Sequence, residues 1–247
     1  MQINESSRRR AIYWGALAAA TIAATAESRA WATIIDDFST DSSASYNLVD
    51  VFGAGGAYSR TGETFTPAAS TSVATSYFRN TGEKFSAAGG DTVSLDLLAI
   101  KQTGIAFTLD PLSDVRTELT IEHDQSPGAW WPTFVDSFTA PTDPETDPIG
   151  LTAGIPATLS VTRDTVDSTK FFFTLTGGGL ADPVDGSFTK AAFLNQDVYF
   201  GIFAYKSGNV VDNLSFTPAP EPSSSSLLMI GFAYCVAKRR RRPGDAV

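Results

Sequence analysis

The middle of the chain is a succession of short runs rich in Val, Ile, Thr, Phe and Tyr, separated by Gly, Pro, Asp and Ser. Those run residues favour half-buried strands, and the separating residues favour turns. Only Ser187–Asn195 has a pattern that suggests a short helix. Strands without helices between them pack as two antiparallel sheets, so residues 33–217 are predicted to form an all-β sandwich. The predicted strands cover 33–38, 46–52, 73–78, 92–100, 105–109, 116–123, 133–138, 158–164, 170–176, 198–205 and 210–216.

Charge and residue counts exclude several classes of protein. The chain of 247 residues is 43% hydrophobic, which is enough for a core. Half of its basic residues lie in the two ends of the chain, and between residues 33 and 219 acidic side chains outnumber basic ones by more than two to one. Such a body should repel nucleic acid. With Cys235 and His123 as the single cysteine and histidine, an intrachain disulfide and a multi-His or Cys-rich zinc site are excluded.

The N-terminus has the layout of an export signal. Arg8–Arg10 precede the apolar stretch Ala11–Ala24, and small residues then recur at Ala24–Ala26 and Ala30–Ala32. This order predicts a secretory signal helix over residues 1–32, cleaved after Ala32, with the export translocon and signal peptidase as partners. A retained membrane helix is the alternative, but the apolar run is shorter than the ~20 residues of a span.

The C-terminus carries three elements in a fixed order. Pro220-Glu221-Pro222 and four serines are followed by an apolar stretch and then by a basic cluster. The apolar helix is built on Leu227, Leu228, Met229, Ile230, Phe232 and Val236, and the basic stop consists of Lys238, Arg239, Arg240, Arg241 and Arg242. Residues 218–247 thereby resemble the PEP-CTERM sorting signal. The resemblance implies processing by a membrane enzyme, exosortase, which would recognise Pro220, Glu221 and Pro222.

The physical chemistry of the tail agrees with that resemblance. Pro220 and Pro222 keep their stretch extended, which suits the grip of a processing enzyme. Basic residues beside a span resist translocation, so both basic clusters should stay cytoplasmic and the body should reach the cell surface or the exterior. Leu227–Ala237 would form only ~16 Å of helix against a hydrocarbon core of ~30 Å, which favours a transient anchor in the membrane.

The body has a second resemblance. Ile34-Ile35-Asp36-Asp37-Phe38 opens it and Val211–Phe216 closes it, with Leu159–Asp164 and Val198–Ala204 between them. This pattern is similar to the concanavalin-A-like (laminin-G-like) jelly-roll bodies that often precede PEP-CTERM tails. It implies glycan binding or a structural role in an extracellular matrix, with extracellular polysaccharide as the partner.

Two groups of residues are candidates for binding. Asp36 or Asp37 would meet Asp212 if the first and last strands pair, and their oxygens could then hold a structural Ca²⁺. The alternative is that these aspartates bind turn amides or water. The indoles of Trp130 and Trp131, held in a loop by the following proline, would stack on sugar rings. The alternative is that they cap the core.

One strand suggests catalysis. Glu118-Leu119-Thr120-Ile121-Glu122 is similar to the Glu-x-Asp-x-Glu strand of retaining β-glucanases, although Thr120 replaces the middle aspartate. Residues i and i+4 lie ~13 Å apart on an ideal strand, whereas a retaining pair needs carboxyls ~5 Å apart. The alternative is a strand face on which both glutamates meet water.

These observations favour an exported, exosortase-processed surface or matrix protein with a non-catalytic sandwich that contacts glycans. A secreted glycoside hydrolase using Glu118 and Glu122 is one alternative, and an inert surface-layer component that packs against its own copies is another.

Overall fold

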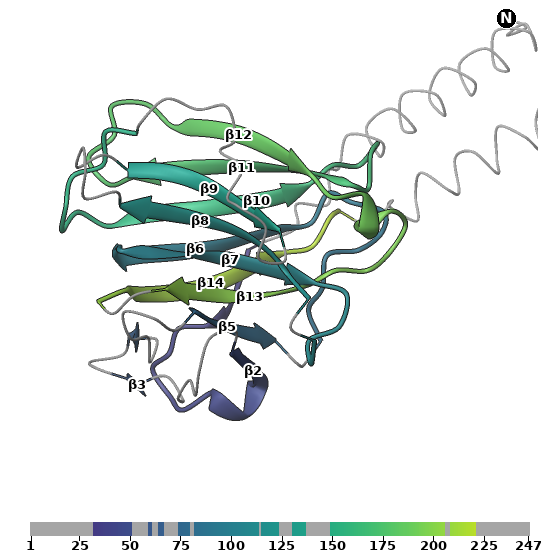
Figure 1. Cartoon of the computed structure of the whole chain (residues 1–247), viewed down its shortest axis with the longest axis horizontal. Coiled ribbons are helices and arrows are strands. Elements are labelled where there is room, and N and C mark those ends of the chain that lie inside the picture. The colour runs from purple at the N-terminus through teal and green to yellow at the C-terminus, as the bar shows by residue number, and fades with distance from the viewer. Residues whose placement is uncertain are drawn as a thin grey trace, which may run out of the picture. The chain divides into compact units, whose positions relative to one another are not determined.

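The computed structural model describes residues 32–50, 59–60, 64–66, 74–79, 82–113, 115–123, 130–136, 149–205 and 208–220. Within these ranges the regular elements are strands and two short 3₁₀ turns, η1 (Ser43–Ser45) and η2 (Ala191–Phe193). The strands form two antiparallel sheets, shown in Figure 1. The prediction of an all-β body with two antiparallel sheets is therefore confirmed.

The larger sheet has the order β12-β11-β10-β6-β14-β4-β3, and β1 also pairs with β14. Its strands are β1 (Thr33–Asp36), β3 (Ser59–Arg60), β4 (Phe65–Thr66), β6 (Thr92–Ala99), β10 (Ala157–Arg163), β11 (Lys170–Gly177), β12 (Val184–Thr189) and β14 (Val210–Thr217). The smaller sheet has the order β2-β5-β13-β7-β8-β9. Its strands are β2 (Tyr46–Asp50), β5 (Ala74–Arg79), β7 (Gln102–Thr108), β8 (Thr117–His123), β9 (Trp130–Asp136) and β13 (Tyr199–Tyr205).

The short helix predicted over Ser187–Asn195 is wrong. Strand β12 continues to Thr189, and only the 3₁₀ turn η2 follows it. The cause is pairing: residues Val184–Thr189 are hydrogen-bonded in register along β11, and Phe188 enters the core. A partner strand satisfies backbone groups that a two-turn helix would leave open at its ends.

The core lies between the facing sheets and is rich in aromatic rings. On the larger sheet, β6 and β10 alternate buried and half-buried residues, so that Leu95 and Leu159 point into the core. On the smaller sheet, Ile105 and its register partners contribute the facing layer. Phe85 lies 5.4 to 6.4 Å from the rings of four other phenylalanines. Offset and edge-to-face contacts of this kind add stabilisation beyond the buried area.

The smaller sheet is also buried on its other face, which we call the outer face. There, Val49, Phe78, Ala106 and Phe203 form a second apolar cluster. As a result every residue of β7 is buried, from Gln102 to Thr108. The outer face is mixed in character, because polar side chains such as Thr120 and Thr133 are buried beside the apolar cluster.

The body begins and ends at the same end of the sandwich. Thr33 of β1 lies opposite Phe216 of β14, next to the last residue of that strand. The pairing of Thr217 with Thr92, and of Thr92 with Thr162, places the end of β10 there too. The bridge between Phe85 and Val198 joins this end to the smaller sheet, near the end of β7. We call it the exit end; the arrowheads of β10 and β12 point toward it in Figure 1.

Candidate functional site

The two tryptophans lie in a strand and not in the loop that the sequence suggested. Strand β9 begins at Trp130, three residues earlier than predicted, with Trp130 opposite His123 and Trp131 opposite Glu122. Strand β9 is the last strand in the order of the smaller sheet and therefore forms one of its edges. Pro132 suits an edge strand because proline has no backbone N–H to donate to a neighbouring strand. The structure thus places the sugar-stacking candidates on an edge strand.

Glu118 does not lie on a water-facing surface. Its side chain is buried on the outer face and accepts a hydrogen bond from Nε of Arg116, which is buried as well. The guanidinium of Arg116 also lies over the ring of Phe203, 5.5 Å from its centroid. The expectation that the glutamates of this strand are exposed to water is therefore wrong for Glu118. An acid committed to an ion pair and shielded from water is poorly placed to protonate a glycosidic oxygen. The side chain of Glu122 lies outside the described residues.

Burial raises the pKa of Glu118, and the charge of Arg116 offsets only part of this effect. A raised pKa means that the Glu118 carboxyl binds its proton more tightly in the folded protein than in the unfolded chain. The contribution of Glu118 to stability is then complete below its ordinary pKa of 4.5 and declines as the pH rises through the folded-state value. We expect Glu118→Gln to remove this decline. Urea unfolding between pH 4 and 8 measures the free energy of unfolding at each pH, and Asp185→Asn, a change of an exposed acid, is the control. If the free energy of unfolding of Glu118→Gln depends on pH as that of the wild type does, Glu118 does not have a raised pKa.

The three aspartates predicted to bind calcium already have partners in the body. Asp36 is buried and accepts hydrogen bonds from the Phe38 amide at 2.9 Å and the Tyr46 hydroxyl at 2.9 Å. Burial, and secondarily the Asp36 charge, raises the pKa of the Tyr46 phenol. Asp37 caps the exposed Ser39 amide, and Asp212 accepts from the Asn213 amide.

The first and last strands do pair, as that prediction requires, with Asp36 opposite Leu214. Among the described residues, however, no three His, Cys, Asp or Glu side chains gather closely enough to hold a metal ion. The calcium site stays a prediction.

The body ends at a clamp that the sequence analysis missed. The buried carboxylate of Asp91 accepts a hydrogen bond from the Ala219 amide at 2.7 Å and another from the Ser86 amide. The next residue, Pro220, is exposed. The chain is therefore held at Ala219, directly before the predicted processing motif. Glu221, Pro222 and the rest of the tail lie outside the described residues, as does the signal segment before residue 32.

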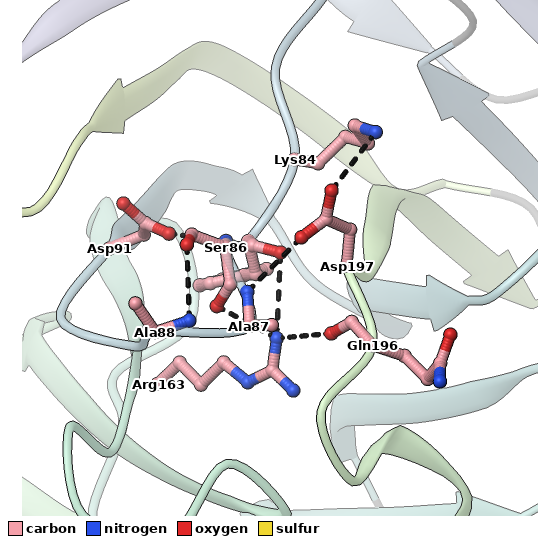
Figure 2. A network of polar contacts seen from close by, with 9 residues as sticks. Lys84, Ser86, Ala87, Ala88, Asp91, Arg163, Gln196 and Asp197 are labelled. Atoms are coloured by element: carbon pink, nitrogen blue, oxygen red, sulfur yellow. Dashed lines mark hydrogen bonds and ion pairs between the residues drawn. The ribbon is translucent and has the colours of Figure 1, made fainter.

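A buried arginine holds together the loops of the exit end. Arg163 is fully buried, and its guanidinium donates to backbone carbonyl groups in three loops, as Figure 2 shows in part. Nε and Nη2 donate to Ser168 at 2.9 and 2.6 Å, and Nη2 also donates to Phe193 at 2.7 Å. Nη1 donates to Ser86 at 2.8 Å and to Gln196 at 2.6 Å. All five N–H groups are satisfied, which a buried guanidinium requires. Burial lowers the pKa of Arg163.

Asp197 adds a second connection to the same loops. Its carboxylate accepts from the Ala87 amide at 3.1 Å and lies 3.2 Å from Nζ of Lys84 (Figure 2). The Ala87 hydrogen bond, and next the Lys84 contact, lower the pKa of Asp197. Together, Arg163 and Asp197 fix the loops around the point where the chain leaves the body.

No family model matches this chain, and no curated protein matches it. Among solved structures, the CBM2 module of an evolved Dit protein from Lactobacillus casei BL23 phage J-1 is 12% identical, over 76% of this chain and 94% of that one, with a TM-score of 0.49. Lectin I-B4 from Griffonia simplicifolia is 14% identical, over 76% and 98%, with a TM-score of 0.45.

A xylan β-1,4-xylosidase from Bacillus halodurans C-125 is 9% identical over 63% of this chain, with a TM-score of 0.44. The match spans 32% of the xylosidase, so it concerns about a third of that enzyme. Likenesses of this degree carry no function from those proteins to this chain. In the described part of the chain, no helix is long and apolar enough to cross a membrane.

Proposed function

We propose that this protein is exported, is processed by an exosortase-type enzyme at its C-terminus, and presents a non-catalytic β-sandwich at the cell surface or in the extracellular matrix. The observation that carries the proposal is the exit end, where Thr33, the first residue of β1, lies near Ala219, whose amide is bound by Asp91. A signal before residue 33 and a tail after residue 219 would then both act on one end of the body. That geometry suits a domain that crosses the membrane while the basic clusters at both ends of the chain stay in the cytoplasm.

The chain immediately after the body suits processing. Asp91 holds Ala219, Pro220 is exposed, and the prolines of Pro220-Glu221-Pro222 disfavour a helix. An enzyme could thus grip this stretch without unfolding any strand. The apolar segment after Ser226 would keep it near the membrane until processing.

The intact mass of the exported protein tests the sorting proposal. We expect the mass to lack residues 1–32 and everything beyond the Pro220-Glu221-Pro222 region. Glu221→Ala should leave most of the protein with its tail attached, because the recognition motif is broken. Asp245→Ala, an acidic change beyond the basic cluster, is the matched control and should be processed normally. A wild-type mass equal to that of the full chain would overturn the proposal.

For the body we propose contact with extracellular polysaccharide through Trp130 and Trp131. The support is their position on edge strand β9, together with the flat apolar surface of the indole ring. We do not assign catalysis to Glu118, because its carboxylate is buried against Arg116.

Affinity electrophoresis through gels that contain the host's purified extracellular polysaccharide tests this contact. Each of Trp130→Ala and Trp131→Ala should weaken retention by about tenfold in Kd, the effect of about 1.4 kcal/mol of lost stacking. Phe172→Ala is the control, because Phe172 is an exposed aromatic residue on the other sheet, at β11. If neither tryptophan variant changes retention relative to Phe172→Ala, the glycan contact does not use this strand.

A further inference from the structure

The exit end carries a group of exposed apolar side chains. Leu112, Val115 and Val166 are 76%, 63% and 93% exposed, and Leu109 and Leu194 are exposed as well. We call these five residues the exit-end patch. The other exposed large hydrophobic residues in the described part of the chain are Ile34, Leu48, Ile155 and Phe172, of which Ile155 lies at the opposite end, two residues before β10 begins.

The loops that bear the patch are built into the body. Leu109 and Val115 line a small pocket together with Lys190 and Phe193, so the loop after β7 packs beside η2. The Thr108 hydroxyl lies 2.9 Å from the carbonyl oxygens of both Asp110 and Val115, which closes the loop, and the Leu112 amide donates to Asp110 within it. These contacts fix the loop in a conformation that leaves its leucine and valine side chains exposed. Exposure of this apolar surface to water is unfavourable, and nothing within the described body offsets it.

The loop that carries Val166 is fastened to the same region. Arg163 donates to Ser168 in this loop and to Phe193 in η2, and the Asn195 amide donates to the Ser168 hydroxyl at 2.9 Å. Val166 and Leu194 therefore sit on neighbouring, mutually bonded loops.

The position of the tail indicates what this patch meets. Seven residues, Pro220–Ser226, separate Ala219 from the first apolar residue of the tail, Leu227. Fully extended, seven residues span at most about 25 Å. If the tail anchors in the membrane, as the proposed function requires, the exit end must lie within that distance of the bilayer. The patch lies at the same end of the body as the point where this tether leaves it.

We propose that the exit-end patch docks on the bilayer surface while the tail is in the membrane, with its leucines and valines entering the interfacial region. The loops that bear the patch also carry Asp110, Asp164 and Asp167, whereas Lys190 lines the pocket beside Leu109 and Val115, so anionic lipids offer little net attraction. The contact is therefore apolar, and zwitterionic lipid is sufficient for it. This inference rests on the proposed export and anchoring.

The experiment places an environment-sensitive fluorophore, NBD, on single cysteines of the full chain carrying Cys235→Ser. The reporters are Leu112→Cys in the patch, Ile155→Cys at the opposite end as control, and Phe232→Cys in the tail. Each protein is reconstituted with phosphatidylcholine vesicles with and without lipids that carry nitroxide groups. Quenching at Leu112→Cys should exceed that at Ile155→Cys by at least about twofold, because interfacial apolar side chains penetrate about 5–10 Å into the boundary between headgroups and acyl chains.

The three labels separate the failure of this inference from failure of the proposed anchoring. Quenching at Phe232→Cys with equal, low quenching at the other two positions would leave the anchor intact and overturn the docking. A blue-shifted but unquenched label at Leu112→Cys would show that protein covers the patch, for example a second copy, and would also overturn it. An unquenched Phe232→Cys label would count against the anchoring, and the Leu112→Cys reading would still decide whether the patch meets lipid.

Discussion

Replacing Arg163 with methionine should lower the free energy of unfolding by at least about 4 kcal/mol. Methionine fills much of the same volume but donates no hydrogen bond, so carbonyl groups in three loops lose their buried donor. An unsatisfied buried polar group costs about 1–3 kcal/mol, and several are created together. Urea unfolding followed by tryptophan fluorescence gives the free energy.

Two further variants make this result specific to the guanidinium. Arg163→Lys keeps the charge, but its single ammonium group cannot reach all three loops, so we expect most of the loss to remain. Lys170→Met removes a cation that lies over the exposed ring of Phe172, and should change stability by less than about 0.5 kcal/mol. If Arg163→Met and Lys170→Met unfold at the same urea concentration, Arg163 does not have the role assigned here.

Adding one methyl group at Gly104 should destabilise the protein by about 3 kcal/mol or more. Gly104 lies in β7 opposite Thr120, on the outer face of the smaller sheet. A Cβ there would stand 2.8 Å from the Thr120 Cα and closer still to the Leu119 carbonyl oxygen. Because backbone cannot turn aside as a side chain can, β7 and β8 must separate, and overpacking of this kind has a large cost.

Gly150→Ala is the matched control, since a Cβ at that position meets no atom within 4 Å. It should leave the melting temperature nearly unchanged, whereas Gly104→Ala should lower it by at least about 6 °C, on a scale of about 2–4 °C per kcal/mol for a domain of this size. Equal melting temperatures for the two variants would show that β7 and β8 are not as close as described.

The sequence predicted the strands wherever β-branched and aromatic residues are dense. Strands β10 and β11 differ from their predicted bounds by only a residue, because their alternation is strict. The two-residue strands β3 and β4 are too short to leave a pattern. Strand β12 was missed because its Asp and Gly disfavour strands, and pairing with β11 outweighs that preference.

The site residues were less accessible to sequence reasoning. Alternation in β8 separates Glu118 from Leu119, but it cannot tell that both faces of this sheet are buried. That requires knowledge of what covers the second face. Arg163 did leave a signal in the sequence. It follows Leu159 and Val161 at every second position of β10, so the alternation predicts that its side chain points to the buried face. Asp91 left none, since its partner Ala219 is more than a hundred positions away.

The pairing of Thr33 with Phe216 has a practical consequence for engineering. A domain whose two termini are adjacent can be inserted into a surface turn of an unrelated host protein without separating the two ends of that turn. Joining positions 33 and 219 with a brief glycine-serine linker should likewise permit circular permutants opened at distant hairpins.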